Sequence, residues 1–336
     1  MKSVKLILIA ILLVVLTAQC APAPAPVEPV GDEAPLFFAA YATPVEEPWV
    51  GVIHTALQKA QAEGKIRYEY TDDIGYAGDM ERVLREVSDQ QKPTAIFGDA
   101  FGNEEAVRRV AKDFPEIAFV FGSGFGPVEP NMAVFDNWIH EPAYLCGLIA
   151  GAVTKTNIIG VVGGYPVPEV NRITHGFIQG VKEVNPDARV LVTFINSWFD
   201  PAAAKEAALA QVDAGADVLF AERFGVIEAA VENNLYSFGN MSDQNYLGPN
   251  SVISAPVWNM TPTVEYVINQ VKGGTFTAQD LKDFSMMGKG GAYLAPFYGL
   301  EASIPAETLA LVRQREQEIL DGLFRVDIVE DIPVSD

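Results

Sequence analysis

The sequence predicts an α/β fold of two similar lobes, and three observations support it. From residue 36 onward, short runs rich in β-branched and aromatic residues alternate with amphipathic helical patterns. The alternation falls into two series of similar length, and no Pro- or Gly-rich linker separates them. Strands that alternate with helices form parallel sheets covered on both faces. Ligands bind at the carboxyl ends of such strands, so we expect a ligand cleft between the lobes.

The first series contains five predicted strands and three predicted helices. The first helix has apolar residues at helical spacing, namely Trp49, Ile53, Leu57 and Ala60, and Pro115 stops the third helix. The predicted strands are residues 36–41, 66–70, 94–97, 117–121 and 131–135, and the predicted helices are residues 49–62, 80–87 and 104–113.

The second series begins with a helical run and repeats the same alternation. Its third helix follows Asp200-Pro201, a pair typical of a helix start. The predicted helices are residues 143–153, 170–184, 202–214 and 226–233, and the predicted strands are residues 158–162, 189–195, 218–221, 236–239 and 251–255.

The first residues are expected to form an export signal and not part of the fold. Two lysines precede an apolar run at residues 6–16, which is too short to span a bilayer permanently. The run leads to Cys20 through small residues, as in a bacterial lipobox, although Gln19 departs from the small residue usual there. We expect a signal peptide at residues 1–19, a lipid on Cys20 and a Pro/Ala-rich tether at residues 20–34. The alternative is an ordinary signal peptide.

Composition excludes several classes of function. The formal charge of −21 argues against a nucleic-acid partner and against adhesion to anionic lipid head groups. Cys146 lies in an apolar helical run and is expected to be a buried hydrophobic residue. The three histidines, His54, His140 and His175, show no metal-ligand spacing. Phosphate-binding loops and nucleophile elbows are also missing from the sequence. We therefore expect neither enzyme activity nor a cofactor.

Five short elements follow one another along the second half of the chain: residues 160–170 (GVVGGYPVPEV), 176–180 (GFIQG), 184–186 (VNP), 195–201 (INSWFDP) and 238–244 (FGNMSDQ). In their order and spacing they resemble the basic membrane protein family of substrate-binding lipoproteins. This resemblance implies a type I periplasmic-binding-protein-like fold with lobes formed by residues 35–137 plus about 258–284, and 138–257 plus about 285–336. It also implies a monomer that is anchored to the outer face of the cytoplasmic membrane and passes a purine-like ligand to an ABC permease.

The resemblance also implies the residues that contact the ligand. Trp49 and Trp198 match the aromatic residues that stack on the two faces of a purine base, and stacking is worth about 1–3 kcal/mol per base. For Trp49 the alternative is a tryptophan buried against the sheet. Phe101 is expected to line the cleft through its backbone.

Edge hydrogen bonds, which distinguish one base from another, are expected from Glu141, Asn240 and Asp243. Glu141 has an alternative role as an acid at a helix start, and Asp243 has one in an Asx turn. The acid that holds ribose in nucleoside-binding relatives is missing after the first strand. We therefore expect a free base, with adenine as the first candidate and a nucleoside as the alternative. A ligand sensor for a membrane signalling partner and a purine-processing enzyme are the other functions considered.

Overall fold

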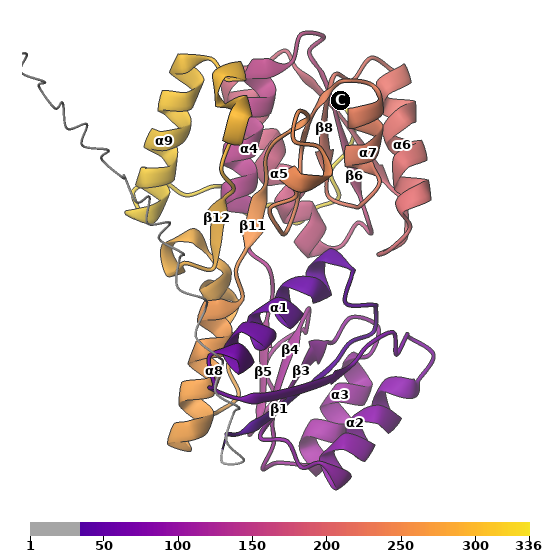
Figure 1. The fold of residues 1–336 in the computed structure, drawn as a ribbon, viewed down its shortest axis with the longest axis vertical. Helices are drawn as coiled ribbons and strands as arrows, with labels where there is room; N and C mark the ends of the chain where they lie inside the picture. Colours follow the sequence, from indigo (N-terminus) through magenta and orange to yellow (C-terminus); the bar gives the residue numbers. More distant parts are fainter. Residues whose placement is uncertain (1–33) are drawn as a thin grey trace, which may run out of the picture.

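The computed structural model describes residues 34–336. The predicted signal peptide, Cys20 and the tether up to residue 33 lie outside the described residues. Among the described helices, none is both long and apolar enough to cross a membrane. The described chain forms two lobes stacked along the long axis of the molecule, which confirms the predicted two-lobed α/β fold (Figure 1).

The first lobe is a five-stranded parallel sheet in the order β2-β1-β3-β4-β5. Helices α1 and α8 cover one face, and α2 and α3 cover the other (Figure 1). The strands are β1 (Leu36–Ala40), β2 (Arg67–Thr71), β3 (Ala95–Asp99), β4 (Ala118–Gly122) and β5 (Met132–Phe135). The helices are α1 (Pro48–Ala62), α2 (Asp79–Gln90), α3 (Glu104–Asp113) and α8 (Thr261–Gly273).

Burial on both faces explains the continuous apolar runs of these strands. In β1, Phe37 and Ala39 belong to the core under α1, whereas Phe38 and Ala40 belong to the core under α2 and α3. All four side chains are buried. A strand sandwiched in this way has no polar face, so its sequence does not alternate.

The second lobe is also a five-stranded parallel sheet, in the order β10-β9-β8-β6-β7. Helices α4, α5 and α9 lie on one side, and α6 and α7 on the other (Figure 1). The strands are β6 (Ile158–Gly163), β7 (Arg189–Phe194), β8 (Val218–Ala221), β9 (Tyr236–Phe238) and β10 (Val252–Ser254). The helices are α4 (His140–Val153), α5 (Pro168–Val184), α6 (Pro201–Asp213), α7 (Val226–Glu232) and α9 (Ala306–Leu320).

Two glycines allow α4 and α5 to approach closely. A Cβ atom at Gly147 would lie 2.0 Å from the Phe177 carbonyl oxygen, and one at Gly180 would lie 2.1 Å from the Tyr144 carbonyl oxygen. The close contact packs the C-terminal half of α5 against α4, and the start of α5 faces the other lobe (Figure 1).

Three chain segments cross between the lobes. The first leads from β5 into α4, the second leads from β11 (Pro256–Trp258) into α8, and the third returns through short 3-10 turns to β12 (Ala292–Leu294). Strands β11 and β12 pair antiparallel beside the second lobe (Figure 1). The exact limits of the lobes, expected from the sequence near residues 137, 258 and 284, remain predictions.

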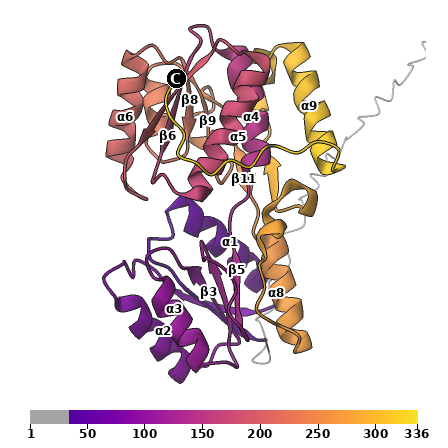
Figure 2. The same ribbon diagram turned by 180° about the vertical axis from the view of Figure 1, so that it is seen from behind.

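The C-terminal segment after α9 lies along the second lobe (Figure 2). At its end, Ser335 Oγ accepts from the Val192 amide at 2.8 Å. Nearer its middle, Asn171 Nδ2 donates to the Glu330 carbonyl oxygen at 2.9 Å. These bonds hold the Glu330 side chain beside the start of α5.

Candidate ligand-binding site

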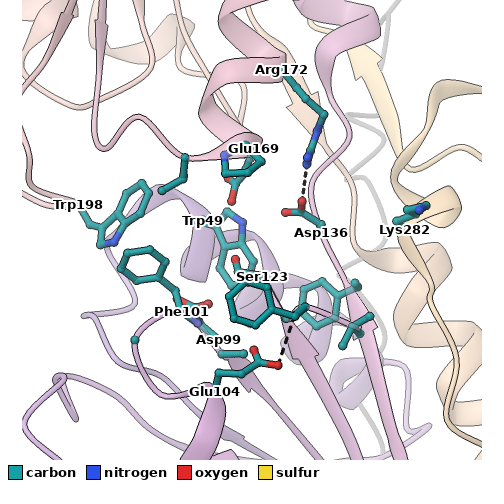
Figure 3. Close-up of a pocket in the computed structure, with 18 of the residues that line it drawn as sticks. Trp49, Asp99, Phe101, Glu104, Ser123, Asp136, Glu169, Arg172, Trp198 and Lys282 are labelled. Atoms are coloured by element: carbon teal, nitrogen blue, oxygen red, sulfur yellow. Dashed lines mark hydrogen bonds and ion pairs between the residues drawn. The ribbon is translucent and has the colours of Figure 1, made fainter. Parts of the chain in front are cut away.

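A cavity of about 580 Å³ lies between the lobes, at the carboxyl ends of the strands and the starts of α1 and α5 (Figure 3). This volume is within the range of small-molecule sites, about 300–1,000 Å³. Residues from both lobes line it, so a bound ligand would touch both.

Aromatic side chains form much of the cavity wall: Trp49, Tyr76, Phe101, Phe125, Phe135, Trp138 and Trp198. The Trp198 ring is half-buried and meets Phe101 edge to face, with 5.2 Å between ring centroids and an interplanar angle of 87°. Flat apolar surfaces of this kind suit a planar ligand.

Trp49 lines the cavity but is also part of the first lobe's core. Its ring stacks on Phe135, with 5.7 Å between centroids and an interplanar angle of 13°, and it lies 5.3 Å from the Trp258 ring. The residue is 6% exposed. Gly122 provides the space, since a Cβ atom there would lie 2.1 Å from the Trp49 ring. Trp49 therefore combines the two roles considered from the sequence: it is buried against the sheet and it also lines the cavity.

Negative charge predominates on the cavity wall, where seven lining residues are acidic and three are basic. The acidic residues are Glu47, Asp99, Glu104, Asp136, Glu169, Asp280 and Glu330, and the basic ones are Arg172, Arg223 and Lys282. Such a cavity repels anions such as nucleotides. It favours neutral ligands that bring hydrogen-bond donors.

A buried ion pair joins the lobes at one end of the cavity. Arg223, which follows β8, donates through Nη1 to Glu47 Oε1 at 2.7 Å and through Nη2 to Glu222 Oε1 at 2.6 Å. Glu47 also caps α1 by accepting from the Val50 amide at 3.0 Å. The Arg223 guanidinium lies 5.3 Å from the Trp198 ring centroid and donates to the Trp198 carbonyl oxygen at 2.9 Å. The ion pair thus fixes both the start of α1 and the Trp198 loop.

A second arginine organises the other end. Arg172 of α5 is paired with Asp136 and donates to Glu330 Oε1 at 2.7 Å. Its guanidinium lies 4.1 Å from the centroid of the Trp138 ring. Burial raises the pKa of Asp136, and the Arg172 charge opposes that shift. This network ties the first crossover, α5 and the C-terminal segment together.

Within residues 34–336, two carboxyl groups of the cavity wall have no arginine or lysine partner. Asp99 ends β3, and its Oδ1 accepts from the Phe101 amide at 2.9 Å. Burial raises the pKa of Asp99 to about 7. Glu169 lies in the first turn of α5, and its Oε1 accepts from Asn137 Nδ2 at 2.7 Å. Burial, and then the nearby Asp136 charge, raise the pKa of Glu169 well above its usual range.

The structure brings three of the six predicted ligand residues together on the cavity wall: Trp49, Phe101 and Trp198. The other three lie elsewhere. Glu141 accepts from the Met287 amide at 2.9 Å, at the third crossover. Asn240 is buried behind the Arg223 network and donates to Glu222 Oε1 at 3.3 Å. Asp243 lines a separate cavity, pairs with the Tyr298 hydroxyl and accepts from the Asn245 amide as in an Asx turn.

Sequence reasoning placed Asp99 beside Phe101 at the cleft but assigned no ligand contact to the charged side chains of the wall. Glu169 belongs to the Pro-Val-Pro-Glu element on which the resemblance depends. Its position in the first turn of a helix could have been predicted from the prolines before it. Arg223 directly follows a buried strand, where a charged residue calls for a partner. Its partner Glu47 lies 176 residues away, which no local pattern indicates.

The family of ABC transporter substrate-binding proteins described as PnrA-like, named Bmp, matches residues 42–284. The chain belongs to this family. Members of the Bmp family are extracytoplasmic, membrane-associated solute-binding proteins that bind small molecules and work with a membrane permease. Membership confirms the predicted resemblance, and it makes the chain a solute-binding protein and not an enzyme.

Proteins similar to this chain differ in the ligands for which they are named. A purine-binding protein of Brucella abortus is 30% identical over 77% of this chain and 72% of its own length. The nucleoside-binding protein BmpA of Lactococcus lactis is 27% identical over 71% of this chain and 72% of its own length. A protein of Haloferax volcanii, named as an ABC transporter glucose-binding protein, is 35% identical over 59% of this chain. The match spans only about half (51%) of that relative's length.

Solved structures agree on the fold of this Bmp protein. An ABC transporter solute-binding protein of Aeropyrum pernix has a TM-score of 0.75 at 19% identity, with 88% of this chain and 94% of that chain covered. One of Conexibacter woesei has a TM-score of 0.70 at 22% identity, with 88% and 99% covered.

Proposed function

We propose that this chain is the lipid-anchored receptor of an ABC importer for a neutral, planar heterocycle of the purine type, with adenine as the first candidate. The observation that carries the proposal is the cavity between the lobes, which combines an aromatic wall with an excess of carboxylates. Aromatic faces bind a flat ring, and carboxylates accept hydrogen bonds from its N–H groups. The purine-binding and nucleoside-binding relatives support the same class.

The charge of the wall supports a free base or nucleoside over a nucleotide. Arg223 and Arg172 are each engaged by two carboxylates, so neither offers a free positive charge to a phosphate. The third basic residue of the wall, Lys282, is likewise paired with Asp280.

A hexose is the second candidate ligand, because one relative is named for glucose binding. Sugars also stack on aromatic rings, and their hydroxyl groups donate to carboxylates. The cavity volume suits either class.

A thermal-shift screen separates these candidates. The mature chain would be heated with adenine, adenosine, pyrimidines, AMP and glucose, each at millimolar concentration. A ligand at 100 times its Kd adds about 2.7 kcal/mol to the free energy of unfolding. We expect stabilisation by adenine and none by AMP. Stabilisation by glucose with none by any heterocycle would refute the proposal.

Import and anchoring need a separate test in cells. Cells that express the chain with its permease should take up labelled adenine, and deletion of the receptor gene should abolish uptake at low concentration. Normal uptake after deletion, together with altered signalling, would instead favour a sensor.

A further inference from the structure

Most of the acidic residues of the cavity wall already have a positively charged partner. Glu47 is paired with Arg223, and both Asp136 and Glu330 with Arg172. In the same way, Glu104 is paired with Arg108 and Asp280 with Lys282. Within the described part of the chain, only Asp99 and Glu169 of the seven have no lysine, arginine or histidine nitrogen within 4.0 Å.

Both unpaired carboxyl groups are held in place by an amide donor on one oxygen. The Phe101 amide fixes Asp99 Oδ1, and the Asn137 side chain fixes Glu169 Oε1. The Ser123 hydroxyl lies beside Asp99. A carboxylate offers about four lone-pair sites, so each group retains capacity for a further donor. Burial raises the pKa of both groups, although the Phe101 amide and Ser123 oppose the shift at Asp99, and the Arg172 and Arg223 charges oppose it at Glu169.

The two groups come from opposite lobes. Asp99 ends β3 of the first lobe, and Glu169 begins α5 of the second. Figure 3 shows Glu169 on one side of the Trp49 indole and Asp99 on the other. A ligand that donates to both would hold the lobes together, so its binding would favour the closed arrangement.

We propose, resting on the function proposed above, that Asp99 and Glu169 select the ligand by each accepting from a different N–H edge of a free aminopurine base. Adenine carries an exocyclic amine on one edge and a ring N–H on another. In a nucleoside the glycosidic bond replaces that ring N–H. The indole nitrogens of Trp49 and Trp198 are buried and have no acceptor in the described structure.

The loss of one donor should carry a large penalty, because the facing carboxylate is then buried without its partner. A hydrogen bond to a charged group is worth about 1.5–3 kcal/mol, which corresponds to about 10- to 150-fold in affinity. We therefore expect 9-methyladenine, which lacks the ring N–H, and unsubstituted purine, which lacks the amine, each to bind about 10- to 150-fold more weakly than adenine.

Calorimetric titration of the mature chain with adenine, 9-methyladenine and purine tests the assignment. Of the variants Asp99→Asn and Glu169→Gln, one should lose the preference for adenine over 9-methyladenine, and the other the preference for adenine over purine. Glu141→Gln is the matched control, because Glu141 is also a buried carboxylate but contacts the Met287 amide outside the cavity. It should keep both preferences.

The outcomes separate the two proposals. Adenine binding with equal affinity for all three probes would overturn this inference and leave the purine receptor standing, even if a variant failed to fold. If folded Asp99→Asn and Glu169→Gln proteins still prefer adenine over both 9-methyladenine and purine, this inference is also overturned and the purine receptor again stands. A wild-type chain that binds none of the three probes would overturn both.

Discussion

Of Trp49→Ala and Trp198→Ala, we expect the first to lower stability more and the second to weaken ligand binding more. Trp49 is 6% exposed and stacks on Phe135, so Trp49→Ala leaves a cavity in the first lobe's core. Substitutions of this kind lower the free energy of unfolding by about 3–5 kcal/mol. Trp198 is half-buried in a loop, and its main neighbours are Phe101, Tyr165 and the Arg223 guanidinium. Trp198→Ala should lower the free energy of unfolding by less than about 2 kcal/mol.

For adenine affinity we expect the reverse order, with a larger loss in Trp198→Ala than in Trp49→Ala. Stacking on one aromatic face is worth about 1–3 kcal/mol, so Trp198→Ala should weaken adenine binding by about 5- to 150-fold. One face of Trp49 is occupied by Phe135, which leaves it less surface to offer a ligand. Urea denaturation and calorimetry of both alanine variants would measure the two effects, with the matching phenylalanine variants as controls. A Trp198→Ala protein with unchanged adenine affinity, or a Trp49→Ala protein of unchanged stability, would refute this reasoning.

Three further predictions concern other parts of the chain. Arg223→Met leaves Glu47 and Glu222 buried without a counter-charge and should lower the free energy of unfolding by about 3–5 kcal/mol in urea denaturation; a loss no greater than that of Glu47→Gln would contradict this. Because the pKa of Asp99 is raised from 3.8 to about 7, the folded state holds this proton more tightly, and stability should fall as pH rises from about 4 to 7. Asp99→Asn should flatten that slope, and an identical slope in the variant would speak against it. Cys20→Ser should move the protein from the membrane to the soluble fraction; a wild-type protein that is soluble and carries no lipid would contradict the lipid anchor.

The strands of the two sheets were predictable because each is buried on both faces. The run at residues 94–97 predicted β3, which extends to Asp99, where the chain turns polar at the cavity. Helices α8 and α9 carry weaker signals and were not predicted. In α9 only Thr308, Val312 and Ile319 are buried, so most of the helix is polar and lacks a broad apolar stripe.

The site was predictable only where one residue could be interpreted without its partner. Trp198 could be placed on the wall by resemblance, because a stacking surface needs no partner from the protein. The contacts of Glu141 and Asp243 agree with the alternatives weighed for them, an acid in a first helical turn and an Asx turn. Such local roles compete with ligand contact for every carboxylate near a helix or strand end. The Glu47–Arg223 pair depends on how the two lobes pack together, and no short stretch of sequence indicates that packing.

The distribution of the indoles provides an optical probe of this receptor. The sequence contains four tryptophans. Trp49, Trp138 and Trp198 line the cavity, and the fourth, Trp258, lies 5.3 Å from the Trp49 ring. Each indole therefore lies at the interlobe cavity or in contact with a residue that does. Intrinsic emission would respond to ligand entry without a background from distant tryptophans, so an unlabelled chain could be titrated in a fluorimeter or followed by stopped flow.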